Sequence, residues 1–260
     1  MLSDDIRSQI ADMVMEANRT KIQATQPSVT WPDIDIDDAY AISSLVAERR
    51  IAAGEKLIGH KIGLTSLAMQ RTLNIDEPDY GYLFDSMAVE DGATVSRADY
   101  CMPRVEIELA FVLGSPLKGP GIGLIDVMRA TEYVVPSIEI VDARFKDPRK
   151  IFDTVSDNGA AAGIVVGGRP VRPDDLDLSW VGGALYRNTQ IEETGVAIGV
   201  LGHPAMGVAW LANRLSRFDT ALEPGHIVLS GSFTRPIHCN PGDTIRADFG
   251  ELGSVSLQFD

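Results

Sequence analysis

Cysteine is scarce in this chain, and long apolar runs are missing. Among the 260 residues only Cys101 and Cys239 are cysteines, too few for a disulfide framework or a cysteine zinc site. No run of eighteen apolar residues occurs, which argues against a membrane-spanning helix. The segment 1–21 also lacks the basic-then-apolar order of a signal peptide. These absences predict a cytoplasmic protein that makes no membrane contact.

Basic residues are in short supply as well. The chain has 23 Lys and Arg against 37 Asp and Glu, a formal net charge of −14. Nucleic-acid binding needs clustered basic side chains that neutralise phosphates, so the composition argues against a nucleic-acid partner. An anionic small molecule stays allowed, because the local field of a pocket outweighs the net charge. The phosphate loop, the dinucleotide fingerprint and the Gly-x-Ser-x-Gly elbow are also absent from the sequence.

The pattern of the chain changes near residue 57. Apolar residues at helical spacing in 3–25 and 37–53 predict two helices. From Leu57 onward, short β-rich runs are separated by Gly, Pro and Asp, with helices inserted at 123–131 and 203–218. We therefore predict an α+β fold with a helical N-terminal layer over residues 1–56. Residues 57–260 are expected to form a β-rich domain that is one compact unit.

Three glutamates interrupt otherwise apolar faces of two predicted strands. If 103–113 is extended, Glu106 and Glu108 point to the same side, with Cα atoms ~6.6 Å apart. Glu139, in the run 134–142, shares its face with valine, serine and alanine. Unpaired buried carboxylates cost several kcal/mol or become neutral. A hard divalent cation removes that cost, so the pattern predicts a Mg²⁺ or Mn²⁺ site built from these glutamates.

The same spacing has a simpler interpretation. A Glu-x-Glu pair on a strand most often marks the solvated face of an antiparallel sheet. The third glutamate, in similar apolar company, favours the metal site. Residue spacing alone leaves both interpretations open.

Several longer segments together resemble a known family. They are GHKIGLTSLAMQ (59–70), EPDYGYLFDSM (77–87), PRVEIELAFVL (103–113), DARFKDPRKIFDTVSDNGAAAG (142–163) and LSGSFTRP (229–236). This set is similar to the hydratase and decarboxylase branch of the fumarylacetoacetate hydrolase superfamily, from about residue 30 to the end. One departure is that the chain is shorter between residues 143 and 152 than members acting on a heptenedioate. The resemblance implies a mixed β-roll core, a homo-oligomer, and Mg²⁺ or Mn²⁺ held by the same three glutamates.

The resemblance also implies an activity. We expect a metal-dependent hydratase of aromatic meta-cleavage catabolism that adds water to a 2-oxo-enoate or 2-hydroxydienoate and forms a 4-hydroxy-2-oxo acid. The expected substrate is 2-oxohept-4-ene-1,7-dioate, with 2-oxopent-4-enoate as the alternative. The nearest rival reaction is decarboxylation of 2-oxo-3-hexenedioate (4-oxalocrotonate), which the same metal and enolate would serve. Some family members bind a decarboxylase, so such a partner is a further alternative.

Two readings from other classes are weaker. An acylpyruvate hydrolase needs a Glu–His pair that activates water, and the N-terminal part shows none. A metal-binding module without turnover would not need Lys61 in addition to the glutamates.

Two residues are predicted to act on the substrate. Lys61 is a basic residue within an apolar strand, and the family motif favours a cation beside the substrate over a snorkelling surface lysine. Asp79 is either a proton-transfer acid or base, if burial raises its pKa, or a turn-forming residue after Pro78.

Three more residues are predicted to contact the substrate. Ser232 lies on a glycine-containing strand that a ligand can approach closely, and His60 precedes Lys61. Arg144 is the third, as the counter-charge of a second carboxylate. Other basic residues offer the same charge from a loop where such side chains are mostly solvated: Arg104, Lys146, Arg149 and Lys150.

Overall fold

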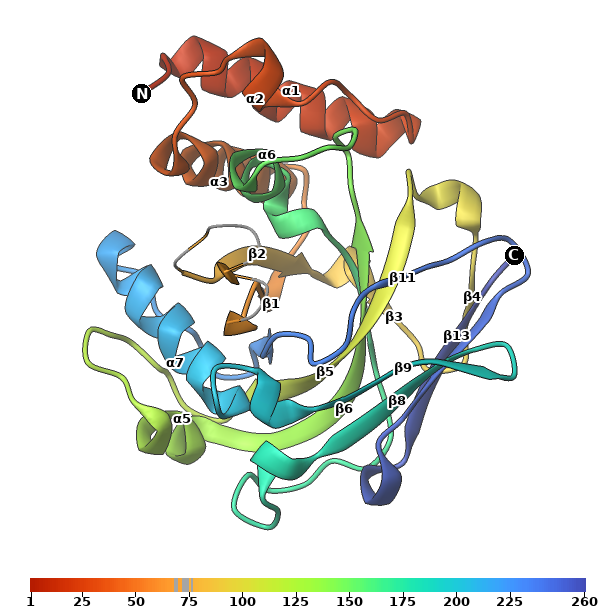
Figure 1. Cartoon of the computed structure of the whole chain (residues 1–260). Helices are drawn as coiled ribbons and strands as arrows, with labels where there is room; N and C mark the ends of the chain where they lie inside the picture. Colours follow the sequence, from red (N-terminus) through yellow and green to blue (C-terminus); the bar gives the residue numbers. More distant parts are fainter. Residues whose placement is uncertain (68–69, 72–74, 76) are drawn as a thin grey trace.

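The helices lie at one end and along one side of two β-sheets in the computed structural model, which describes residues 1–67, 70–71, 75 and 77–260 (Figure 1). The α-helices are α1 (Asp4–Thr20), α2 (Pro27–Thr30), α3 (Ile36–Ala52), α5 (Leu124–Ala130), α6 (Ile151–Ser156) and α7 (Pro204–Leu215). Single 3-10 turns connect other elements: η1 (Asp85–Met87), η2 (Arg97–Asp99), η3 (Asn158–Ala160), η4 (Leu178–Trp180), η5 (Ala197–Gly199), η6 (Ser216–Phe218) and η7 (Gly250–Leu252).

The N-terminal layer forms because its two long helices are capped and share an apolar interface. The Ser3 side chain accepts a hydrogen bond at the start of α1, and Asp35 and Asp38 make a capping box at the start of α3. Buried side chains of both helices pack with Phe145 from the β-rich part. The sequence predicted α1 and α3 but not α2, whose four residues are too short for a periodic pattern.

The larger sheet supplies most of the pocket described below. Its strands follow the order β2, β1, β10, β5, β6, β7 and β3, and β11 pairs with β5. Their bounds are β1 (Leu57–Gly63), β2 (Asp79–Phe84), β3 (Ala88–Val89), β5 (Pro103–Leu113), β6 (Thr131–Asp142), β7 (Ala161–Val166), β10 (Ile227–Leu229) and β11 (Ile237–His238). The β1–β10 and β3–β7 pairs are parallel and the other pairs antiparallel, so the sheet is mixed.

A second, antiparallel-rich sheet packs beside the first. It follows the order β4, β13, β12, β8 and β9. Its strands are β4 (Thr94–Val95), β8 (Gly182–Arg187), β9 (Gln190–Val196), β12 (Thr244–Asp248) and β13 (Ser254–Phe259). One apolar core joins residues of both sheets with α5 and α7, for example Ile107, Leu185, Leu211 and Leu257.

The architecture agrees with the predicted α+β class, in which a mixed β core carries a helical N-terminal layer. Among the described residues, no helix has the length and apolar character needed to cross a bilayer. The boundary between residues 56 and 57 as a domain division stays a prediction.

Candidate metal centre and active site

Pairing between β5 and β6 brings the three glutamates together. Glu106 lies directly opposite Glu139, and Glu108 lies opposite Ser137. Directly opposed residues of an antiparallel pair project to the same face of the sheet, and so do residues two apart on one strand. As a result, one carboxylate oxygen from each glutamate lies within 4.8 Å of the other two. The strand geometry expected from the sequence is the one observed.

Burial leaves these carboxylates with too few hydrogen-bond donors. Glu108 and Glu139 are fully buried, and Glu106 faces the pocket. The Gly231 backbone N–H donates to Glu108 Oε2 at 2.7 Å. Among the described residues, Glu108 Oε1 and both Glu139 oxygens have no hydrogen-bond partner. Lys61 Nζ lies 3.4 Å from Glu139 Oε1, an ion pair whose geometry falls short of a hydrogen bond.

The protonation of the cluster reflects this shortage. Burial, and then repulsion from Glu139, raises the pKa of Glu106 to about 8, although part of this side chain faces the pocket. Burial also raises the pKa of Glu108 well above its usual range and raises that of Glu139, against the opposing pull of Lys61. Two buried carboxylates with unpaired oxygens and a third carboxylate at the pocket wall all resist ionisation and converge on one region, which fits a divalent cation with oxygen ligands.

Lys61 and Asp79 reach the same region from the neighbouring strands β1 and β2. The two strands are antiparallel, with Gly63 opposite Asp79. Lys61 and Asp79 are both buried, and Asp79 Oδ1 has no hydrogen-bond partner in the described part of the chain. Burial raises the pKa of Asp79, and attraction to Lys61 and the Gly63 N–H only partly offset this. The carboxylates around Lys61 outweigh its burial and raise its pKa, so the ammonium form is favoured.

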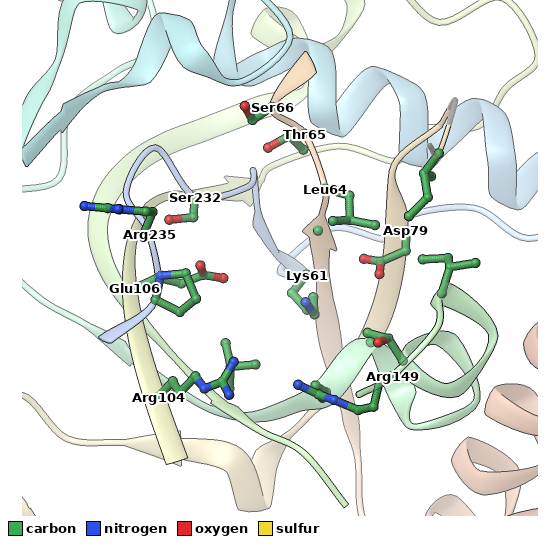
Figure 2. A pocket seen from close by; sticks show the side chains of 18 of the residues that line it. Lys61, Leu64, Thr65, Ser66, Asp79, Arg104, Glu106, Arg149, Ser232 and Arg235 are labelled. Atoms are coloured by element: carbon green, nitrogen blue, oxygen red, sulfur yellow. The ribbon is translucent and has the colours of Figure 1, made fainter. Parts of the chain in front are cut away.

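These side chains line a cavity of about 610 Å³ (Figure 2). Lys61, Asp79, Glu106 and Ser232 are all on its wall. Figure 2 shows Lys61 and Asp79 on one side and Glu106 and Ser232 on the other, with open space between them. A cavity of this size, with a few converging polar groups and perturbed carboxylates, has the properties of a small-molecule site.

Ser232 belongs to the segment that follows β10 and passes beside Glu106 and Glu108. Its Oγ donates to the Thr234 carbonyl at 2.9 Å and accepts from the Thr234 N–H at 3.1 Å. This network holds the hydroxyl at the pocket wall, as a substrate contact requires. The role of Ser232 as such a contact stays a prediction.

The structure does not bring His60 or Arg144 to the pocket wall formed by the described residues. On β1 the His60 ring lies on the opposite face from Lys61, 5.3 Å from the Tyr82 ring centroid, and burial lowers its pKa to about 3. Arg144 is buried: its guanidinium donates to the Asp157 side chain and to the Asp157 and Ala161 carbonyls. Both geometries argue against a substrate contact.

Two glycines that the sequence analysis did not assign to the site also shape it. A Cβ at Gly63 would collide with Asp79 Oδ1, and a Cβ at Gly231 would collide with Thr65. Gly231 also has φ of +111°, a conformation that side chains rarely adopt, and its N–H reaches Glu108. Glycine inside a strand pattern was the available signal, because it often marks a close approach of backbone.

Comparison with known proteins places the chain among proteins of related chemistry. The chain is 51% identical to 2-oxo-hept-4-ene-1,7-dioate hydratase of Escherichia coli, over 96% of both chains. It is 41% identical to 2-keto-4-pentenoate hydratase of Paraburkholderia xenovorans, over 89% of this chain and 86% of the relative. It is also 35% identical to 4-oxalocrotonate decarboxylase of Pseudomonas sp. CF600, over 90% and 89%.

Solved structures give the same grouping. The 4-oxalocrotonate decarboxylase of Pseudomonas putida G7, complexed with magnesium and adipate, superposes with a TM-score of 0.97 at 31% identity, over 100% of this chain and 99% of that one. The model of the fumarylacetoacetate (FAA) hydrolase C-terminal family matches residues 57–259. The chain therefore belongs to the fumarylacetoacetate hydrolase family, in its hydratase and decarboxylase branch.

Proposed function

We propose that this protein is a Mg²⁺-dependent hydratase that adds water to 2-oxohept-4-ene-1,7-dioate or its 2-hydroxydienoate form. The observation that carries the proposal is one cavity walled by Lys61, Asp79 and Glu106, with Glu108 and Glu139 beside them. Fifty-one per cent identity to the E. coli hydratase supports the choice of reaction and substrate. Mn²⁺ as an alternative ion, a homo-oligomeric state and a cytoplasmic location belong to the same proposal.

The glutamates would hold the metal, and the other residues would handle the substrate. When bound, the ion supplies Lewis-acid stabilisation of the negative charge that develops on the substrate's 2-oxygen. The Lys61 ammonium, 3.4 Å from Glu139, is placed to bind the 1-carboxylate or the enolate oxygen.

Asp79 is the proposed proton donor. Its raised pKa keeps a proton on the carboxyl to higher pH than usual, and Oδ1 is not engaged by another described residue. The acid delivers that proton to C5 of the dienolate, which moves the double bond to C3–C4. Because this alkene is conjugated to the 2-oxo group, C4 becomes electrophilic. Water then adds at C4 and the product is a 4-hydroxy-2-oxo acid.

Decarboxylation of 4-oxalocrotonate is the second candidate. The decarboxylase of P. putida G7 has the same fold at 31% identity. The enolate stabilisation described above would serve loss of the 6-carboxylate equally well, because the electron pair released at C5 passes through the C3–C4 alkene to the 2-oxygen. The pocket residues named so far suit both reactions.

Product analysis separates the two reactions. The Mg²⁺-loaded protein is incubated with freshly generated 2-hydroxyhepta-2,4-diene-1,7-dioate, with the pentadienoate, and with 2-oxo-3-hexenedioate, and products are followed by NMR. We expect a 4-hydroxy-2-oxo acid that no longer forms after chelation. Carbon dioxide release from the hexenedioate, with no hydration of the other two compounds, would overturn the hydratase assignment and leave the decarboxylase.

A further inference from the structure

We infer that Arg104 and Arg149 form a second anion subsite at the end of the pocket away from the metal centre, which selects a dicarboxylate substrate by binding its distal carboxylate. The inference rests on the proposed function and adds to it the residues that bind the second carboxylate. Both arginines line the same cavity as Lys61, Asp79 and Glu106.

The position of Arg104 follows from the register of β5. Residues 104, 106 and 108 alternate with buried Val105 and Ile107, so Arg104 projects on the same face as the metal-site glutamates. Its Cα lies ~6.8 Å from that of Glu106 and ~13.6 Å from that of Glu108 along the strand. One rigid element thus carries the groups for both ends of an elongated substrate.

Arg149 approaches Arg104 from the loop before α6. Figure 2 shows the two side chains pointing toward each other along one border of the pocket. They converge on a single carboxylate, because Asp147 Oδ2 lies 3.4 Å from Arg104 Nη2 and Asp147 Oδ1 lies 3.0 Å from Arg149 Nε. Both arginine side chains are mostly covered, with exposures of 26% for Arg104 and 14% for Arg149.

The charges around these arginines do not balance. Two guanidiniums share one aspartate, and neither has another hydrogen-bond acceptor among the residues that the structure describes. One positive charge and several N–H donors are therefore left facing the cavity. A carboxylate is a ligand that suits such paired guanidiniums, because each can donate two parallel hydrogen bonds to it.

Apolar side chains line the cavity beside the arginine pair and suit a carbon chain. Val141, Ile151 and Phe152 line the cavity together with Arg104 and Arg149. Val141 lies directly opposite Arg104 on β6. A ligand with carboxylates at both ends would place its charged groups on the polar ends of the pocket and its methylene groups on these apolar side chains.

Other arginines do not qualify. The guanidinium N–H groups of Arg144 donate to Asp157 and Ala161, as described above. Arg235 lies at the rim, but its side chain is 81% exposed and pairs with Glu193. The pair formed by Arg104 and Arg149 is distinguished by partial burial, shared pairing and excess charge.

The first test compares substrates that differ in the second carboxylate. Arg104→Gln and Arg149→Gln are assayed with the seven-carbon dienedioate and the five-carbon pentadienoate. We expect kcat/KM for the dienedioate to fall about 10- to 100-fold, because a hydrogen bond to a charged group is lost, and kcat/KM for the pentadienoate to stay unchanged. Arg187→Gln is the matched control: this partly buried arginine pairs with Glu192 on β9 and is not among the described residues that line the cavity.

A binding measurement tests the subsite apart from turnover. Adipate and hexanoate have six carbons each and differ in one carboxylate, so calorimetric titration of Mg²⁺-loaded protein isolates the distal contact. We expect wild type to prefer adipate about 10- to 100-fold and both arginine variants to lose that preference, while Arg187→Gln keeps it.

The outcomes separate the two proposals. Equal affinity of the wild type for adipate and hexanoate, or an unchanged preference in both arginine variants, would overturn the subsite even if the protein is a hydratase. An adipate preference that the variants abolish, in a protein that hydrates none of the dienoates, would support the subsite and reject the proposed reaction. Because Arg149 is in a loop, its variant keeps the test valid if Arg104→Gln disturbs β5.

Discussion

Buried acidic side chains in two regions of this molecule differ in their hydrogen bonding: in one region they have partners, and in the other they lack them. In the N-terminal layer, Asp38 accepts from the Leu2 N–H and from Arg7, and on the adjoining α6 Asp153 accepts from the Ser28 N–H and hydroxyl. Asp157 accepts from the Arg144 side chain. These carboxylates have partners that hold α1, α2 and α6 in place.

The acids at the pocket lack such partners. Glu108 Oε1, both Glu139 oxygens and Asp79 Oδ1 are buried without a hydrogen bond from any described residue. Because an unsatisfied buried carboxylate destabilises the folded chain, its retention needs a reason outside the fold itself. The comparison shows that unsatisfied oxygen atoms, more than burial or charge, separate a binding site from structural ion pairs.

The largest effect is expected when the unsatisfied cluster is changed. Glu108→Gln replaces one metal ligand with a neutral isostere. Metal affinity and activity should fall more than about 100-fold, which exceeds the loss usual when a residue that only orients a metal ligand is mutated. Without metal, the variant should melt at a higher temperature than the wild type, because a buried carboxyl is gone. Calorimetric Mg²⁺ titration and thermal melts in chelator check this, and unchanged metal affinity would contradict the assignment.

Removing one partner of a buried, hydrogen-bonded ion pair should lower the stability of the fold and not the catalytic rate. Arg144→Gln leaves Asp157 buried without its cation, and the free energy of unfolding should fall by about 3–5 kcal/mol. Burial raises the pKa of Asp157 only to about 6, so the charge is present at neutral pH. Urea unfolding measures the loss, and Arg144→Gln with Asp157→Asn should recover part of it. If Arg144→Gln instead keeps full stability and loses the preference for dicarboxylates, Arg144 contacts the substrate.

Asp79→Asn addresses the unsatisfied acid that is not a metal ligand. Proton delivery to C5 would stop, so kcat should fall about 100- to 1,000-fold while Mg²⁺ affinity is retained. Steady-state kinetics with parallel metal titration test this. In the wild type, activity should decline as pH rises past the raised pKa of Asp79, because the carboxyl then loses the proton it donates. If kcat is kept in the Asn variant, Asp79 is not the acid.

The last expected effect is a pH dependence of the metal-free protein. The folded chain holds the Glu106 proton up to about pH 8, whereas an unperturbed glutamate releases it near 4.5. Between these values the folded state binds more protons than the unfolded state, so stability should fall as pH rises. Thermal melts in chelator across this range would show the decline, and saturating Mg²⁺ should reverse it. A flat profile would mean that the carboxyls ionise without cost.

The sequence predicted the strand-borne part of the site better than the loop-borne part. Period-two alternation placed Glu106, Glu108 and Glu139 on one face, and β5–β6 pairing then set them side by side. The strand geometry argues against the prediction for His60. Neighbours along a strand point to opposite faces, so a residue adjacent to Lys61 turns away from the pocket.

Loop residues could not be separated in the same way. Arg144 and Arg149 lie in one charge-rich segment, yet the first turns to Asp157 and the second toward the cavity. No periodicity governs such a segment, because its side-chain directions depend on tertiary contacts. The assembly of the predicted strands into two separate sheets and the short helix α2 likewise depend on packing that the linear pattern does not encode.

The register of β5 against β6 also makes metal binding a check on folding. A slip of one residue between these strands would send a full set of side chains to the other face of the sheet, and the Glu106–Glu139 pairing would be lost. A misregistered chain would then be unable to gather three carboxylates. The ion would therefore stabilise only correctly paired molecules, and metal availability during synthesis would influence how much protein matures as well as how fast it works.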